Sequence, residues 1–221
     1  MRITILAFSF LLTVFLSQAS SSPMSSKAIR SLVICGPSGV GKGTLINRLL
    51  KNYPNKMGLS VSHTSRKPRE GEIDGVHYHF VDKKSIQEDI QSGKIPYIEH
   101  AEVHAQIYGT REDAVAKVHE EGKLCILDVD KNGVKSIKLH GLPAKFVFVT
   151  PKSPQVLEAR LRSRGTETEE QIQLRLKNAQ SEMEYGLVEG NFDLVLVNED
   201  LDVAYRTLVA QLRSWFPLFN L

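Results

Sequence analysis

Cysteine is scarce in this sequence, which excludes several kinds of protein. The 221 residues include only Cys35 and Cys125, and no Cys-x-x-Cys pair exists. This argues against a disulfide framework and against a cysteine-based zinc or redox centre. Each cysteine lies inside an apolar run, at 32–35 and 124–127, that is typical of a buried strand. We therefore expect two buried free thiols, which suit a reducing compartment.

An excess of charge of one sign is also absent. The chain has 28 Lys and Arg residues against 25 Asp and Glu residues, a net charge of +3. So small an excess gives no support for broad nucleic-acid binding, and we predict no nucleic-acid partner. The 42% of hydrophobic and 24% of charged residues are ordinary for a folded protein. The length suits one globular domain with a core.

Only one long apolar run is present, at residues 3–16, and it is too short to span a bilayer comfortably. With Arg2 before it and small residues after it, the run has the shape of a signal peptide. In a rival interpretation, translation starts at Met24 and the residues before it are optional. In either case residues 1–27 are an N-terminal extension of the domain. We predict a cytoplasmic domain without stable membrane insertion, and organellar or secretory targeting by this run is the alternative.

Short apolar segments alternate with helical patterns from residue 30 onward. We expect strands at 31–35, 59–62, 124–129, 145–149 and 192–197. We expect helices at 44–51, 110–121, 153–164, 169–185 and 201–215. This alternation is typical of an α/β fold, a doubly wound parallel sheet with helices on both faces. The polar, aromatic-dotted stretch 60–108 interrupts it, which predicts an inserted mixed or antiparallel lobe.

A phosphate-binding loop follows the first expected strand directly. It has the P-loop spacing of Gly, four residues, Gly and Lys, between a strand and a helix. Backbone N–H groups of such a loop surround phosphate oxygens, while the helix N-terminus and Lys42 add positive charge. The predicted phosphate-binding residues are Gly36, Pro37, Ser38, Gly39, Val40, Gly41, Lys42, Gly43 and Thr44. Because Gly43 replaces the usual Ser or Thr, no hydroxyl at that position can reach a metal ion.

Two further groups of charged residues fit an anionic ligand. Arg66 and Arg69 are three positions apart, and a pair of guanidinium groups can grip a phosphate dianion. Asp128 and Asp130 follow the apolar run 124–127, at the carboxyl end of a strand, where open α/β sheets bind ligands. Alternation along the strand would send both carboxylates to the same side.

Arginines also gather around Gly165, which separates two expected helices. Arg160, Arg164 and Arg175 could be brought over a transferring phosphoryl group by a closing segment, where they would stabilise its charge. Arg162, in contrast, is interpreted as an exposed helix charge with partners three or four positions away.

Several separated motifs, in this order, resemble the guanylate kinase family. They are the P-loop, the segment 60–72 followed by 75–80, and the Arg-Gly-Thr-Glu-Thr-Glu sequence at 164–169. The resemblance implies a P-loop kinase domain at 28–221, with a GMP-binding lobe at 60–110 and a helical lid at 158–175. It implies a monomer that converts ATP and GMP, and also dGMP, into ADP and the diphosphate, with Mg²⁺ bound to ATP.

The resemblance also implies roles for individual residues. Glu99 is the carboxylate that accepts guanine N1–H and N2–H₂, a choice over Glu102 that the residues alone do not make. The implied GMP-binding residues are Ser62, Arg66, Arg69, Tyr78, Glu99, Tyr108, Thr110 and Asp130. The implied catalytic residues are Lys42, Arg66, Arg164 and Arg175, and Arg160 and Asn198 join the P-loop at ATP. Asp128 would hold Mg²⁺ through water, with Thr44 as a second metal candidate.

Two alternatives are weighed against this prediction. One is a catalytically silent guanylate-kinase-like domain that binds phosphorylated proteins, but an intact Lys42 loop and the lid arginines favour an enzyme. The other is a P-loop kinase for AMP or a small alcohol, which the choice of acceptor would distinguish.

Overall fold

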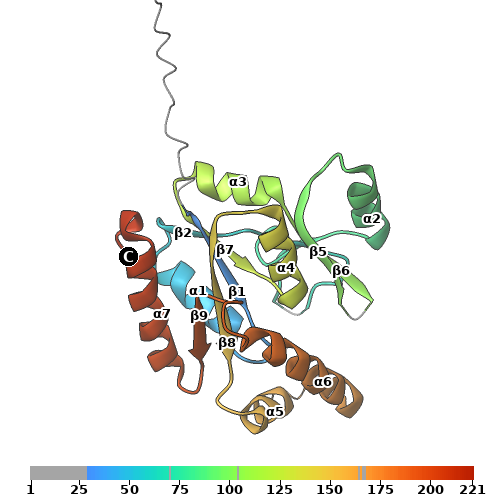
Figure 1. Ribbon diagram of the computed structural model, residues 1–221. Helices are drawn as coiled ribbons and strands as arrows, with labels where there is room; N and C mark the ends of the chain where they lie inside the picture. Colours follow the sequence, from blue (N-terminus) through green and yellow to red (C-terminus); the bar gives the residue numbers. More distant parts are fainter. Residues whose placement is uncertain (1–28, 70, 104, 164, 166–167) are drawn as a thin grey trace, which may run out of the picture.

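The computed structural model describes residues 29–69, 71–103, 105–163, 165 and 168–221 (Figure 1). The expected extension 1–27, including Met24, lies outside the described residues, and so does the expected lid residue Arg164.

A five-stranded sheet forms the centre of the molecule, with the order β2-β7-β1-β8-β9 and parallel pairing throughout. Its strands are β1 (Ser31–Cys35), β2 (Met57–Leu59), β7 (Leu124–Asp128), β8 (Ala144–Thr150) and β9 (Leu194–Val197). In the β1–β7 register Ile34 lies opposite Asp128. The carboxyl ends of these two strands therefore meet at one edge, where the predicted phosphate loop and strand-end carboxylates come together.

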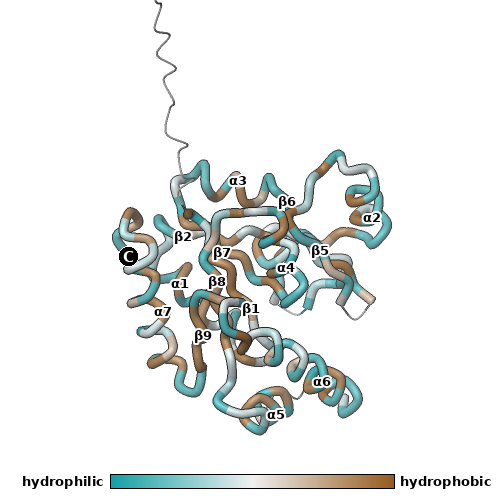
Figure 2. The backbone as a smooth tube through the Cα atoms, in the orientation of Figure 1, coloured by the Kyte–Doolittle hydropathy of each residue, from teal (hydrophilic) through white to brown (hydrophobic). Residues whose placement is uncertain are grey.

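Helices cover both faces of this sheet. On one face α1 (Lys42–Asn52), α5 (Pro154–Ser163) and α7 (Leu201–Trp215) share a buried cluster with Leu32 and Ile34. On the other, α3 (Glu112–Glu120) and α4 (Lys131–His140) share a cluster with Val33 and Cys35. Successive residues of a strand point to opposite faces, so β1 supplies both cores. Figure 2 shows apolar residues concentrated along these strands. The doubly wound sheet is confirmed.

Two further helical elements, α6 and η1, belong to the part of the molecule around the five-stranded sheet. α6 (Glu169–Gly186) follows α5 and contributes Ala179 to the first cluster, while Met183 packs against the second. The 3-10 turn η1 (Pro217–Phe219) follows α7 near the C-terminus. Figure 1 places α5 and α6 together at one end of the molecule.

The segment between β2 and α3 forms a second, smaller sheet with the order β4-β3-β6-β5. Its elements are β3 (His63–Thr64), β4 (His79–Phe80), α2 (Lys83–Ser92), β5 (Tyr97–Val103) and β6 (Gln106–Arg111). β3 pairs parallel with β4, whereas β6 pairs antiparallel with both β3 and β5. The sheet is mixed, as expected, and it lies beside the larger sheet with α2 at its outer side (Figure 1).

Some elements differ from the expectation. β2 ends at Leu59 although a strand was expected at 59–62, and α3 begins at Glu112 because the preceding residues of the expected helix complete β6. Helices α2 and α4 were not predicted. Each is preceded by an aspartate N-cap. The side chain of Asp82 accepts a hydrogen bond from one backbone N–H group of the first turn, and that of Asp130 accepts from two.

Both cysteines are buried and free, as expected. Within the described ranges, no helix has both the length and the apolar character needed to cross a membrane.

Candidate active site

The P-loop occupies the turn from β1 into α1. A Cβ atom on Gly36 would lie 2.2 Å from the carbonyl oxygen of Val149, so only glycine lets the loop pass this close to β8. Gly41 is the N-cap of α1 at a φ of 104°, and no side chain caps the helix there. Backbone N–H groups at this helix end remain open to an anion. Lys42 donates from Nζ to the Gly36 carbonyl over 2.5 Å, which holds its ammonium over the loop.

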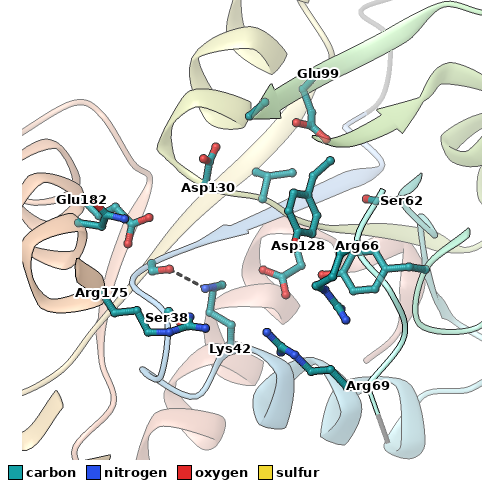
Figure 3. A pocket seen from close by; sticks show the side chains of 16 residues that line it. Ser38, Lys42, Ser62, Arg66, Arg69, Glu99, Asp128, Asp130, Arg175 and Glu182 are labelled. Carbon is teal, nitrogen blue, oxygen red and sulfur yellow. Dashed lines mark hydrogen bonds between the residues drawn. The ribbon is translucent and has the colours of Figure 1, made fainter. Parts of the chain in front are cut away.

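One cavity collects most of the predicted site residues, between the P-loop, the smaller sheet and α6 (Figure 3). The predicted residues that line it are Gly36, Ser38, Lys42, Ser62, Arg66, Arg69, Tyr78, Glu99, Tyr108, Asp128, Asp130 and Arg175. Predicted residues outside its lining are Pro37, Gly39, Val40, Gly41, Gly43, Thr44, Thr110, Arg160 and Asn198. The cavity therefore brings together residues that are far apart in the sequence, from Gly36 to Glu182.

The paired arginines lie at the lower right of Figure 3. Arg66 donates two hydrogen bonds to the Glu72 carboxylate, at 2.8 Å and 3.0 Å, and these bonds orient the Arg66 guanidinium. That guanidinium also lies 5.3 Å from the ring centroid of Tyr78, whose ring meets Tyr108 edge-on at 5.9 Å. Burial raises the pKa of Tyr78 to about 12, so its hydroxyl stays protonated and can donate to an anion. Arg69 is exposed, and it forms with Arg66 a pair that we call the guanidinium clamp.

A buried carboxyl lies at the opposite end of the cavity. The Glu99 residue is 5% exposed, and Thr110 donates from Oγ1 to its Oε1 atom over 2.6 Å. The hydroxyl of Ser62 lies 2.8 Å from that of Thr110, so the three side chains form one hydrogen-bonded chain. Burial raises the pKa of Glu99 to about 7, with the Asp130 charge acting in the same direction. This carboxyl is therefore a largely desolvated acceptor, which a ligand with adjacent N–H donors in the cavity could satisfy.

The strand-end carboxylates take different roles. Asp128 ends β7 at the cavity, and burial raises its pKa while the Lys42 charge opposes the rise. Asp130 lies beyond the strand and caps α4, accepting at Oδ1 from the N–H groups of Asn132 and Gly133 at 2.9 Å and 2.8 Å. The strand expected through residue 129 ends at Asp128, so Asp130 lies beyond it as the extended N-cap residue of α4. Both residues nevertheless line the cavity.

The arginines of the predicted lid lie at the P-loop. Arg175 donates to the Ser38 hydroxyl over 2.7 Å, so α6 touches the loop directly. Arg160 donates to the backbone carbonyls of Val40 and Glu199, at 3.3 Å and 3.1 Å. Arg164 lies outside the described residues. These contacts hold Arg160 and Arg175 against the P-loop.

Arg162 pairs with Glu158 at 2.7 Å and with Glu169 at 2.6 Å on the helix surface. Its interpretation as a surface charge with a partner four positions away is confirmed.

Asn198 follows β9 and braces the same loop. It is 3% exposed and donates from Nδ2 to the Val40 carbonyl over 2.8 Å. Its Oδ1 atom is buried without a hydrogen-bond partner among the described residues.

Sequence reasoning missed several cavity residues, namely Ala101, Val129, Asn178 and Glu182. Asn178 and Glu182 follow Arg175 at spacings of three and seven along α6, so a helical wheel drawn from Arg175 could have found them. Glu72 was also missed as the partner of Arg66, because a contact within a polar loop leaves no periodic signal.

These features define a class of protein. The P-loop lies at the carboxyl end of β1 in a parallel sheet. Across the cavity from it lie the arginine pair Arg66 and Arg69, which can bind a second anion, and the buried carboxyl of Glu99, which can accept hydrogen bonds. This arrangement is typical of P-loop kinases that act on nucleotides. The guanylate kinase family model matches residues 28–214. The chain belongs to the guanylate kinase family.

Individual relatives agree with this assignment. The chain is 55% identical over 179 residues to guanylate kinase 1 of Oryza sativa subsp. japonica, covering 81% of this chain and 46% of that protein. It is 47% identical to the guanylate kinase of Homo sapiens, covering 81% of this chain and 90% of that protein. It therefore spans about half the length of the rice relative.

A solved structure extends the agreement to the fold. The crystal structure of guanylate kinase from Anaplasma phagocytophilum matches with a TM-score of 0.64 and 29% identity, over 85% of this chain and 87% of that one. The two chains therefore share one fold over most of their lengths.

Proposed function

We propose that this chain is a guanylate kinase that transfers the γ-phosphoryl group of ATP to GMP, with dGMP as a second acceptor. The observation that carries the proposal is the meeting, in one cavity, of Lys42 at the P-loop, the guanidinium clamp at Arg66 and the buried carboxyl of Glu99. The first fits a triphosphate, the second a monophosphate and the third a base with adjacent N–H donors.

Guanine recognition rests on the charge state of Glu99. An ionised carboxylate accepts two N–H bonds side by side, and guanine offers N1–H and N2–H₂ in that arrangement. Adenine has no such donor edge and would leave the buried carboxylate unpaired, at a cost of about 1–3 kcal/mol. The hydroxyl chain from Ser62 through Thr110 holds the carboxylate in place.

The phosphoryl transfer itself needs positioning and positive charge more than proton transfer. A GMP phosphate oxygen is already a competent nucleophile, so no general base is required. Arg66 and Arg69 would hold this phosphate, while Lys42 and Arg175 face the group that moves. We further propose that Arg164 joins Arg175 over the transferring phosphoryl group and that Arg160 and Asn198 support the ATP side.

Mg²⁺ is part of this proposal, and Asp128 suits it. The Asp128 carboxyl lines the cavity beside Lys42 and accepts no hydrogen bond from the described residues. A single carboxylate that acts through water, together with phosphate oxygens, is a donor set that Mg²⁺ commonly takes. When bound with ATP, the ion supplies positive charge against the phosphate oxygens. Thr44 is exposed in the first turn of α1 and is the weaker candidate.

The silent binding domain remains the competing proposal. Such a domain has no need of a lysine held over the P-loop or of an arginine from α6 bound to Ser38. We also propose that the domain works as a cytoplasmic monomer. Two buried free thiols support a reducing compartment, and the N-terminal residue of the native protein would test the targeting alternative.

A coupled assay with MgATP and GMP, dGMP or AMP tests the proposal. Turnover of GMP supports it, binding of GMP without turnover supports the silent domain, and preference for AMP supports a different kinase. Lys42→Ala should reduce the rate at least about a hundredfold, since it removes transition-state charge stabilisation. Lys51→Ala, an exposed lysine in the last turn of α1, is the matched control and should keep the normal rate.

A further inference from the structure

Helix α6 presents a polar face to the cavity that the proposed reaction uses only in part. Arg175, Asn178 and Glu182 are spaced three and four positions apart, so they lie on one side of the helix, and all three line the cavity. Arg175 has a role at the P-loop, whereas Asn178 and Glu182 have none. Figure 3 shows Glu182 on the far side of the cavity from Arg66 and Arg69.

Glu182 has a carboxyl group without a hydrogen-bond partner among the described residues. Its side chain is partly buried. Burial raises its pKa to about 7, while the Lys42 charge lowers it and the Asp130 charge raises it. Buried polar groups are normally hydrogen-bonded. The carboxyl is therefore placed to bind something that enters the cavity.

The other carboxyls of the cavity already have a hydrogen-bond partner or a proposed role. Glu99 accepts from Thr110 and faces the base, and Oδ1 of Asp130 accepts two backbone N–H groups. Asp128 is the carboxyl proposed above to hold Mg²⁺ through water. A nucleotide with its base at Glu99 and its phosphate at Arg66 places its sugar between these ends. We infer that the sugar hydroxyls face α6, which forms the wall of the cavity across from Arg66 and Arg69 (Figure 3).

We propose that Glu182 accepts a hydrogen bond from the ribose 2′-hydroxyl of GMP and so makes the site prefer GMP to dGMP. The inference rests on the proposed function and adds a specificity-determining residue to it. A carboxylate that binds a ribose 2′-hydroxyl is a recurrent solution in nucleotide-binding α/β folds. Asn178, one turn before Glu182, presents an amide to the same region of the cavity.

GMP and dGMP differ only in this hydroxyl, so the experiment compares kcat/KM for the two acceptors. We expect the normal protein to favour GMP roughly tenfold, the usual effect of one hydrogen bond to a charged acceptor. In Glu182→Ala, kcat/KM for GMP should fall and kcat/KM for dGMP should change little, so most of the preference for GMP is lost. Glu184→Ala, an exposed position on the same helix, is the matched control and should keep the ratio.

A ratio that stays the same in Glu182→Ala, whatever the absolute rates, would overturn the inference. Calorimetric titration of the unaltered protein with each nucleotide is an independent measurement that does not depend on the variant folding. Equal affinities for GMP and dGMP would overturn the inference, and a GMP preference supports it. Tighter binding of GMP without any phosphoryl transfer would overturn the proposed function while leaving the inference supported.

Discussion

Thr110 donates its hydroxyl hydrogen to Oε1 of Glu99 over 2.6 Å, and both side chains are buried between β5 and β6. The two residues are partners in the antiparallel ladder, so the strand pairing itself sets this contact. One lone pair of the carboxyl is used, and the rest of its acceptor capacity remains for a ligand. The Glu99 carboxyl is therefore oriented by a hydrogen bond within the protein, without a nucleotide.

Glu99→Gln should reduce kcat/KM for GMP roughly tenfold to a hundredfold, because an amide offers one acceptor and a donor where guanine presents two donors. The rate with AMP should change little, so discrimination between the bases falls. Steady-state kinetics with both acceptors measures it. Glu102→Gln is the matched control, since that exposed carboxyl pairs with Lys83 outside the cavity. If both variants discriminate normally, Glu99 does not read the base.

GMP affinity should rise with pH through about 7. The pKa of Glu99 is raised to about 7, so the accepting carboxylate forms over that range. We expect the affinity for GMP to rise on the order of tenfold between pH 5.5 and 8.5. Binding titrations of GMP over this range, run in parallel on the wild-type protein and Glu99→Gln, measure this change. The variant cannot ionise at this position, so its profile should be flatter. Equal profiles would contradict the assignment.

The same group should destabilise the ligand-free fold as pH rises. Its folded pKa is about 7 and its ordinary value is 4.5, so the folded state holds the proton more tightly. The stability conferred by that proton is complete below about 4.5 and is lost by about 7, a loss of about 3 kcal/mol. Burial lowers the pKa of His63 to about 4, and this opposes the trend. The difference in melting temperature between the normal protein and Glu99→Gln across this range isolates Glu99.

Arg66→Lys should lower kcat/KM for GMP by roughly a hundredfold although the charge is kept. Arg66 is held by two parallel hydrogen bonds from its guanidinium to Glu72, and an ammonium cannot reproduce that fork. Kinetics with GMP, together with a melting curve to verify folding, measures the effect. Lys67→Ala removes an exposed neighbouring charge and should be nearly silent. An Arg66→Lys variant of normal efficiency would show that charge alone suffices there.

Gly36→Ala should unfold the P-loop or destabilise the protein by several kcal/mol. The added Cβ would lie 2.2 Å from the Val149 carbonyl oxygen, which is a backbone atom and cannot move away as the end of a flexible side chain could. Gly43→Ala is the matched change in the same loop, because a Cβ there meets nothing within 4 Å and lies in the first turn of α1. It should be neutral or stabilising by about 0.5–1 kcal/mol. Denaturant unfolding of both variants measures the contrast.

Local patterns predicted the parts of the molecule in which one periodicity or one motif dominates. The apolar runs that contain Cys35 and Cys125 are buried parallel strands, as expected, because only strands covered on both faces can bury every residue. The phosphate loop was recognisable because its glycines and Lys42 must follow one another directly. The short helices α2 and α4, each preceded by an aspartate N-cap, were not predicted.

The sequence by itself determined the doubly wound core and the P-loop, since strand burial and backbone conformation depend on neighbouring residues. Only the tertiary structure decided which acids and bases share the cavity. Lys42, Glu99 and Glu182 lie far apart along the chain, and their distances depend on strand order and on the packing of α6. The choice of Glu99 over Glu102 is of this kind, because a ladder partner at Thr110 and burial on one side of β5 separate two otherwise similar carboxyls.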